Sequence, residues 1–154
     1  MTRRTRMTIA GVVAVAALVG MVFIVLHAVR GSSSSFATER WALDGKCKRV
    51  LVARTTTQRA RGLRRATTLG PNAGMLFVFP SESDAYFTMA QTLISLDIGW
   101  YDGTGRRVDE AHMTPCPKGT DATCPTYAAK NAYRYAFEAV GGAGSPSLIS
   151  PCSA

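Results

Sequence analysis

The feature that most constrains this 154-residue chain is an uninterrupted apolar stretch from Ile9 to Val29. It contains 21 residues with no formal charge at neutral pH. As a helix the stretch would be about 30 Å long, which matches the hydrocarbon core of a bilayer. We therefore predict a single transmembrane helix over residues 9–29, through which the chain contacts the lipid bilayer. The remaining length suits one domain and is too short for two.

The charges that flank this stretch predict its orientation. Arg3, Arg4 and Arg6 lie in the basic leader, residues 1–8, whereas Arg30 alone follows the stretch directly. Because positively charged flanks stay in the cytoplasm, we expect a single-pass protein of the cell membrane with an extracytoplasmic domain. A cleaved signal peptide is the alternative, but its apolar core would be shorter and would end in a small-residue cleavage site, for which this chain has only a poor match.

The cysteines agree with an extracytoplasmic location. All four lie after the apolar stretch, and an even number in an exported domain predicts two disulfides. Cys116 and Cys124 flank a turn-rich polar loop that would bring them together, which leaves Cys47 to pair with Cys152 and join the two ends of the domain. A structural zinc site is the alternative, but there is no Cys-x-x-Cys pair, and His112 is the one histidine after the stretch. We expect no metal and no cofactor.

Composition divides the rest of the chain into a linker, a domain and a tail. Residues 30–36 contain four consecutive serines and predict a flexible linker. Residues 37–145 form the predicted domain. Residues 146–154 are rich in serine and proline and predict a C-terminal tail.

Most of the predicted domain consists of short runs typical of β-strands. They cover residues 49–54, 75–79, 85–89, 96–101, 106–113 and 133–139. The second run is apolar on both faces and predicts a central strand that Pro80 ends. In the last run, Tyr133, Tyr135 and Phe137 are expected to point inward. This pattern predicts a mainly β fold, a compact sandwich or barrel-like domain with one or two short helices.

Two shorter segments give local predictions. Residues 55–65 are expected to form a short helix, which Thr56 or Thr57 would cap and Gly62 would weaken. Residues 102–105, Asp-Gly-Thr-Gly, are a strong hairpin signal between two of the predicted strands.

Several motifs in a fixed order resemble the family known as domain of unknown function 192. They are Arg-Ala-Arg-Gly-Leu (59–63), Ala-Gly-Met-Leu-Phe-Val-Phe-Pro (73–80), Phe-Thr-Met (87–89), Thr-Leu-Ile-Ser-Leu-Asp-Ile (92–98), Asp-Gly-Thr-Gly-Arg-Arg-Val (102–108), Thr-Pro-Cys (114–116) and Tyr-Ala-Phe-Glu (135–138). The resemblance covers roughly residues 49–142. It implies a compact, mainly β sandwich that is often exported or membrane-linked, and it implies no defined activity.

The chain also departs from the pattern of that family. Where the family usually has Met-Lys-Asn-Thr, this chain has Met89-Ala90-Gln91-Thr92, so a cation is lost and an amide is changed. Where the family usually has Pro-Leu-Asp, residues 95–97 are Ser-Leu-Asp. If the Lys-Asn pair contacts a ligand in relatives, that contact is altered in this chain.

Five side chains are candidates for ligand binding, namely Arg61, Met89, Gln91, Thr92 and Asp97. In the run 96–101, Leu96, Ile98 and Trp100 are expected on one face and Asp97 on the other. Asp97 would then either point into a polar groove or accept backbone hydrogen bonds near a turn. Arg61 could bind an anion or belong to a solvated helix face. Met89 is more simply a core residue, whereas Gln91 and Thr92 could donate hydrogen bonds into a cleft.

Basic residues are concentrated over 46–65. There is no acidic residue between Asp44 and Glu82, and this interval holds Lys46, Lys48, Arg49, Arg54, Arg59, Arg61, Arg64 and Arg65. Such a surface could contact anionic headgroups or an acidic envelope polymer, and uneven charge on a solvated surface is the alternative. The extracytoplasmic location argues against nucleic acid as a partner.

The sequence has no motif that identifies an enzyme class. It lacks a Gly-x-Ser-x-Gly elbow, a phosphate-binding Gly-rich loop and a His-Glu-x-x-His motif. We therefore expect a binding or accessory module for a cell-envelope ligand, either anionic or a saccharide. The alternative is an envelope enzyme of hydrolase or transferase type that uses Asp97 and Arg61 in a groove.

Overall fold

The computed structural model describes residues 35–153 of the chain. The basic leader, the transmembrane helix predicted over residues 9–29 and most of the serine-rich linker lie outside this part. Within residues 35–153, no helix has the length and apolar character needed to cross a bilayer.

The described residues form a mainly β domain, as predicted. One short helix, α2 (Thr56–Arg61), accompanies strands β1 (Ala37–Leu43), β2 (Lys46–Ala53), β3 (Met75–Ser83), β4 (Phe87–Thr88), β5 (Leu96–Tyr101), β6 (Arg107–Met113), β7 (Thr126–Tyr127), β8 (Tyr133–Val140) and β9 (Ile149–Pro151).

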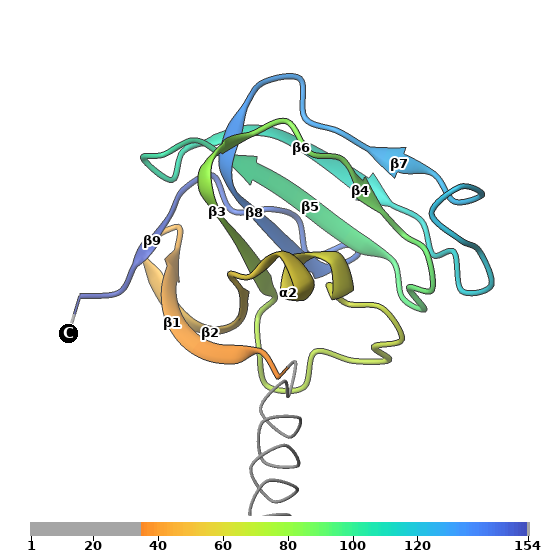
Figure 1. Ribbon diagram of the computed structural model, residues 1–154. Coiled ribbons are helices and arrows are strands. Elements are labelled where there is room, and N and C mark those ends of the chain that lie inside the picture. The colour runs from red at the N-terminus through yellow and green to blue at the C-terminus, as the bar shows by residue number, and fades with distance from the viewer. Residues whose placement is uncertain (1–34, 154) are drawn as a thin grey trace, which may run out of the picture. The chain divides into compact units, whose positions relative to one another are not determined.

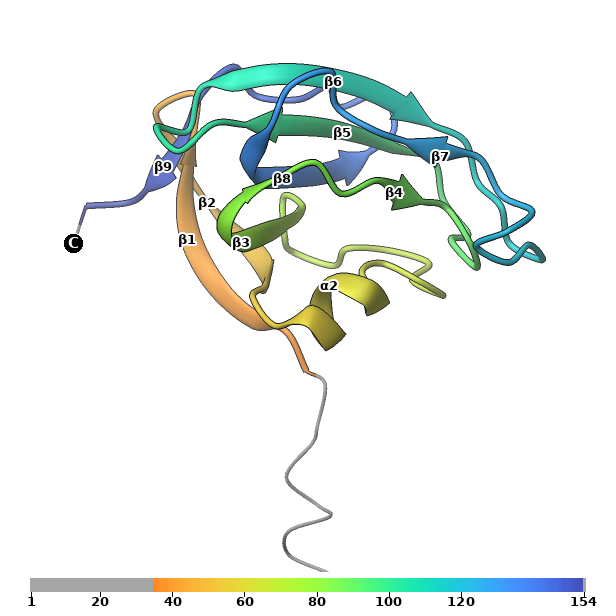
Figure 2. The same ribbon diagram turned by 45° about the horizontal axis from the view of Figure 1, so that its top comes forward.

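A single curled sheet, and not a sandwich of two sheets, organises the domain. Seven strands follow the order β6-β5-β8-β3-β2-β1-β9, and β4 pairs separately with β7. All pairs in the large sheet are antiparallel except β2 with β3, which are joined through α2. Strand β3 pairs with both β2 and β8. It therefore joins the strands on its two sides into one continuous half-barrel, where a sandwich would have two separate sheets. Figures 1 and 2 show α2 on its concave side.

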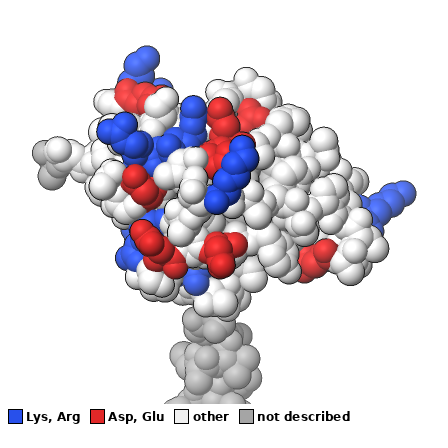
Figure 3. Space-filling view, turned by 90° about the horizontal axis from the view of Figure 1, so that it is seen from above, with Lys and Arg blue, Asp and Glu red and all other residues white. Residues whose placement is uncertain are grey.

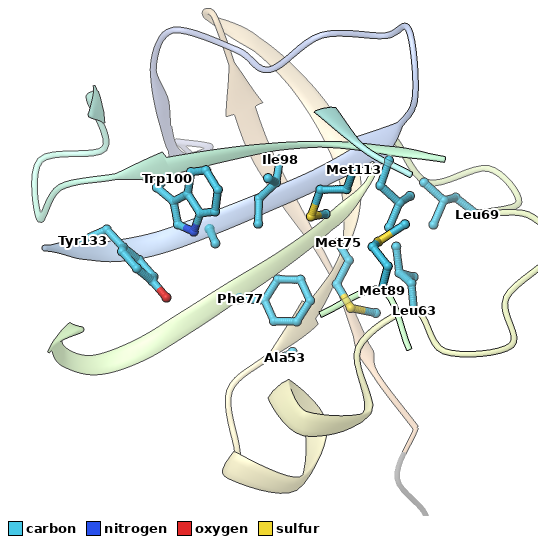
Figure 4. Close-up of a cluster of buried hydrophobic side chains, with 12 residues drawn as sticks. Ala53, Leu63, Leu69, Met75, Phe77, Met89, Ile98, Trp100, Met113 and Tyr133 are labelled. Atoms are coloured by element: carbon cyan, nitrogen blue, oxygen red, sulfur yellow. The ribbon is translucent and has the colours of Figure 1, made fainter. Parts of the chain in front are cut away.

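Apolar side chains pack on both faces of this sheet. The inner core lies on the α2 side (Figure 4) and comprises Ala53, Leu63, Leu69, Met75, Phe77, Met89, Leu96, Ile98, Trp100, Met113, Tyr133 and Ala136. The outer core lies on the other face and comprises Trp41, Val50, Val52, Leu76, Tyr101, Phe137, Ala139 and Ile149. Strand β5 therefore divides its side chains between the two faces as its alternating sequence predicts.

The structure corrects two predictions about strands β3 and β8. Strand β3 does not end at Pro80 but continues to Ser83, with an irregular register against β8 between Val78 and Ser83. Because of this irregularity Tyr133 packs in the inner core, whereas Phe137 packs in the outer core. The aromatic residues of β8 thus serve both faces, and not one face as expected.

The two ends of the domain contain strands that the sequence patterns did not predict. Strand β1 pairs along its length with β2, and its outer edge pairs with β9 at Trp41, Ala42 and Leu43. Strand β9 lies in the segment 146–154, which was expected to be a tail. That segment therefore belongs to the sheet.

The N-cap of helix α2 is Thr55, one residue before the predicted caps Thr56 and Thr57. The hydroxyl of Thr55 accepts a hydrogen bond from the backbone N–H of Gln58 at 3.1 Å, and the Gln58 side chain accepts one from the backbone N–H of Thr55 at 3.1 Å. This reciprocal capping box needs Gln three residues after the cap, a spacing that Thr56 and Thr57 lack. The helix ends at Gly62, whose φ of 46° lies in the left-handed region that favours glycine.

Both disulfides form with the expected pairing. Cys116 joins Cys124 across the polar loop, and Cys47 joins Cys152 across 105 residues of sequence. Cys47 lies on β2 and Cys152 directly follows β9, so the longer bridge ties the strands at one margin of the sheet together.

Candidate functional site

A pocket of about 560 Å³ opens between α2 and the concave face of the sheet. Its walls come from α2 and the turn after it, from β3, from the segment leading into β4, and from the disulfide-closed loop 116–124. Strand β8 contributes Glu138 to this pocket. Clefts of this volume are typical of small-molecule sites.

Glu138 is the polar group that distinguishes the pocket. Glu138 is 5% exposed, and among the described residues no group hydrogen-bonds to its carboxyl. Its neighbours across the strands are Met75 on β3 and Ile98 on β5, both in the inner core. Burial raises the pKa of Glu138 to about 8, so the carboxyl is mainly protonated at neutral pH. In that form it donates one hydrogen bond and accepts others.

Thr92, a predicted site residue, lines the same pocket. Thr92 is 3% exposed. Its backbone N–H donates to the Met89 carbonyl (2.9 Å), and its backbone carbonyl accepts from the Cys116 N–H (3.2 Å). Within residues 35–153 no partner hydrogen-bonds to its hydroxyl. Two buried groups that both donate and accept therefore share this pocket.

Aromatic rings supply much of the remaining wall. Phe77, Phe79 and Phe87 line the pocket, and the rings of Phe77 and Phe87 pack edge to face at 5.1 Å between centroids. Tyr86 also lines it and is 63% exposed, which places this residue toward solvent. Aromatic and other apolar side chains thus form one part of the pocket wall, beside polar and charged ones.

Three arginines of α2 and its following turn line the pocket as well, among them the predicted residue Arg61. The Arg61 guanidinium lies over the ring of Phe36 at 5.2 Å, and that of Arg59 lies over Phe79 at 4.9 Å. Arg64 forms an ion pair of 2.5 Å with Asp121 from the disulfide-closed loop. Arg59 thus lies on an aromatic residue of the pocket wall, whereas Arg61 lies on Phe36, which does not line the pocket.

Asp97 lies elsewhere. One carboxylate oxygen accepts a hydrogen bond from Nδ1 of His112 at 2.6 Å, and the other accepts backbone N–H groups of Gly142 and Gly144 at 2.8 Å each. Burial acts most strongly and upward on the pKa of Asp97, but these hydrogen bonds outweigh it and hold the pKa below its usual range. The expectation of backbone hydrogen bonds near a turn is met. The structure does not bring Asp97 and Arg61 together.

A smaller hollow of about 340 Å³ is lined by Asp97, Glu110 and His112 with neighbouring residues. It lies on the other side of β5 from the inner core, since Asp97 faces Ala139 of the outer core. The carboxylate there already has three partners, so this hollow offers little unsatisfied polarity.

A model of the DUF192 family, described as an uncharacterized ACR, matches residues 39–151. The chain belongs to the DUF192 family. No significant match was found among curated proteins.

Two solved structures resemble this DUF192 domain. One is a candidate transcription regulator from Sinorhizobium meliloti 1021, with 23% identity and a TM-score of 0.61; the match covers 75% of this chain and 95% of that one. The other is a protein of unknown function from Novosphingobium aromaticivorans DSM 12444, with 23% identity and a TM-score of 0.60, covering 78% and 89% respectively. At this identity the likeness concerns the fold alone.

Residues 89–92, Met-Ala-Gln-Thr, form a tight turn beside the pocket. Met89 is 1% exposed and belongs to the inner core, so packing explains it. Gln91 does not line the pocket; its backbone accepts from the N–H of Arg65 (2.8 Å) and donates to the carbonyl of Cys116 (3.0 Å). Its φ of 60° is left-handed, a conformation that asparagine tolerates better than glutamine. The backbone at position 91 would therefore suit the asparagine that the family resemblance implies there.

Sequence reasoning did not select Glu138 as a site residue, although it belongs to one of the DUF192 motifs. The available signal was a single carboxylate in the middle of an apolar strand, between Phe137 and Ala139. Charged residues are rarely fully buried without a partner, so such a position indicates a functional group once burial is known.

The basic residues of 46–65 do not form a continuous positively charged surface, because acidic side chains pair with some of them. Arg54 pairs with Glu39 at 2.8 Å, and Arg64 pairs with Asp121. Figure 3 shows basic and acidic side chains interspersed on one face of the domain. Lys46, Lys48 and Arg49 on β2 are exposed.

Proposed function

We propose that this DUF192 protein is a membrane-anchored, extracytoplasmic binding module and that its envelope ligand occupies the pocket containing Glu138. The observation that carries the proposal is a carboxyl group that is buried in the pocket and has no hydrogen-bond partner among the described residues. Burying an unpaired polar group costs free energy of folding. A ligand that hydrogen-bonds to Glu138 would offset this cost, whereas a purely structural role leaves it unexplained.

The geometry favours binding over the enzyme alternative. An enzyme that combines Asp97 with Arg61 needs both at one groove, but Arg61 lines the α2-side pocket and Asp97 lies on the other face of β5. Asp97 is also fully engaged with His112 and with backbone N–H groups. The separation supports a binding role for the pocket.

Ligand binding is tested by a thermal-shift screen of the full chain in lipid nanodiscs against glycans, phospholipid headgroups and metal ions. Binding in the pocket is expected to raise the melting temperature of the wild type and not that of Glu138→Leu, which fills the site with an apolar side chain. Glu110→Gln, a change at an exposed carboxyl of β6, is the control and should respond as the wild type does. Equal shifts in the Glu138→Leu variant would contradict the assigned pocket.

The anchor is tested separately. An uncleaved helix over residues 9–29 predicts that the chain remains in the membrane fraction after an alkaline carbonate wash and has the intact mass of the full sequence. A mass that lacks the leader and the apolar stretch would establish a cleaved signal peptide instead, and the domain would still be extracytoplasmic.

The proposal includes the basic segment 46–65 as a surface for an anionic envelope polymer or anionic headgroups. The exposed cations of β2 support it, because exposed charges attract such a partner over a Debye length of about 8 Å. Lys48→Glu should lower the salt concentration that elutes the chain from immobilised polyglutamate. No change in elution would remove this surface from the proposal.

A further inference from the structure

The chemistry of the pocket specifies the class of ligand, an inference that rests on the proposed function. We propose that the pocket takes an uncharged, hydroxyl-bearing ring of the saccharide type, whose hydroxyl groups exchange hydrogen bonds with Glu138 and Thr92 and whose apolar face packs against the phenylalanine rings.

The polar groups in the pocket match hydroxyls. A protonated Glu138 carboxyl and the Thr92 hydroxyl each donate and accept, and a sugar hydroxyl does the same. An anionic group at this point would lose its hydration and would face the carboxyl oxygens of Glu138. The protonated carboxyl has one O–H to donate, and this single hydrogen bond would have to compensate for the desolvation of the anion. A hydroxyl group costs less to desolvate, because it carries no net charge.

The aromatic wall matches the other half of a sugar ring. Phe77, Phe79 and Phe87 line the pocket, and a pyranose presents apolar C–H groups on its faces and hydroxyls around its edge. A ring packed against these side chains would therefore direct its hydroxyls toward polar groups at the margin of the aromatic surface. Ligand pockets commonly combine an apolar contact surface with placed polar groups in this way.

The charges around the pocket do not select a charged ligand. The titratable groups that line it with Glu138 are Arg59, Arg61 and Arg64 from α2 and its turn, Glu82 from β3, Tyr86 before β4, and Asp121 from the disulfide-closed loop. With Glu138 protonated, three cations stand against two carboxylates. A cationic ligand would pass the arginines to reach Glu138, and an anionic one would meet Glu82, since Asp121 is already paired with Arg64. An uncharged ligand meets neither penalty.

The test measures binding of three probes to the full chain in nanodiscs by isothermal titration calorimetry. They are the uncharged N-acetylglucosamine trimer, inorganic phosphate and ethanolamine. We expect the trimer to bind and the two charged probes not to bind. Glu138→Leu should weaken trimer binding at least 10-fold, about 1.4 kcal/mol. Glu138→Gln, which keeps one donor and one acceptor, should retain wild-type affinity at neutral pH, and Glu110→Gln should be unaffected.

The pH dependence of trimer affinity distinguishes direct binding by Glu138 from a purely structural role of this residue. Wild-type affinity for the trimer should fall as the pH passes 8 and Glu138 ionises, whereas Glu138→Gln should show no such fall. Binding of phosphate or ethanolamine that depends on Glu138 would overturn the saccharide inference and leave the proposed function standing. Trimer binding that is unchanged in Glu138→Leu, or no trimer binding at all, would also overturn it. The broader thermal-shift screen decides the proposed function independently.

Discussion

Asp97 and Glu138 lie on the neighbouring strands β5 and β8 but point to opposite faces of the sheet. The register sets Asp97 opposite Ala139 and Ile98 opposite Glu138, so the two carboxyl groups are separated by the sheet itself. Asp97 receives three hydrogen bonds, whereas Glu138 receives none from the described residues. One buried carboxyl therefore stabilises the fold, and the other faces the pocket at a cost in stability.

Glu138→Gln is expected to stabilise the domain at neutral and alkaline pH. Since the fold raises the pKa of Glu138 from 4.5 to about 8, the unfolded chain loses this proton between those values while the folded chain keeps it. Wild-type stability should therefore fall as the pH rises from 4.5 to 8, by roughly 5 kcal/mol, and the variant should lack this fall. Denaturation of the full chain in nanodiscs, followed by the fluorescence of the buried Trp41 and Trp100, measures the difference. An identical pH dependence in both proteins would refute the assignment.

Asp97→Ala is expected to destabilise the domain by about 2–4 kcal/mol, because it leaves two backbone N–H groups and a histidine without their acceptor. His112→Ala should cost less, since it preserves the hydrogen bonds from Gly142 and Gly144. The lowered pKa of Asp97 means that its contribution is present above pH 3.8 and is lost as the pH falls through the folded pKa. Acid denaturation curves of the two variants compare these effects; a larger loss in His112→Ala would contradict them.

Gln91→Gly is expected to raise stability by about 0.5–1 kcal/mol. Gln91 has a φ of 60°, a left-handed conformation that costs an L-residue free energy and costs glycine little. Gln91→Ala is the matched control, because it removes the same side-chain contact with Arg65 and keeps the strained conformation. The midpoint of guanidinium denaturation should be higher for glycine than for alanine, and the reverse order would show that φ is not the cause.

Removing the two disulfides is expected to have unequal effects. By loop-closure entropy, the double variant Cys47→Ser/Cys152→Ser should lose about 4–5 kcal/mol, and Cys116→Ser/Cys124→Ser about 2–3 kcal/mol. The second variant should also loosen the loop that holds Asp121 against Arg64 at the pocket. Denaturation midpoints rank the two changes. Mass spectrometry without reductant should find the wild type four hydrogen atoms lighter than its reduced form, two for each disulfide.

The elements that depend on local sequence were predictable. The alternation of residues 96–101 assigns both faces of β5, and the Asp-Gly-Thr-Gly hairpin follows from turn chemistry, with Asp102 accepting the backbone N–H of Thr104 at 2.8 Å. The mainly β class follows from several such runs. These features need no knowledge of which strands are neighbours.

The site depended on pairings between distant segments. Glu138 is buried because β8 lies between β3 and β5 with apolar side chains on both faces, a consequence of strand order that no local pattern contains. Likewise Tyr133 changes face through the irregular pairing with β3. Arg61 and Thr92 were recognised as candidates, but their common pocket follows from the crossover that places α2 on the concave side of the sheet.

The bridge between Cys47 and Cys152 turns residues 47–152 into a covalently closed ring. A protease that cuts one peptide bond inside the ring opens it but releases no fragment, because the two pieces remain joined through sulfur. Loops that border the pocket, such as residues 116–124, lie within this ring. In an oxidising compartment rich in proteases, a molecule cut once within this ring would keep all its strands in one covalently connected molecule.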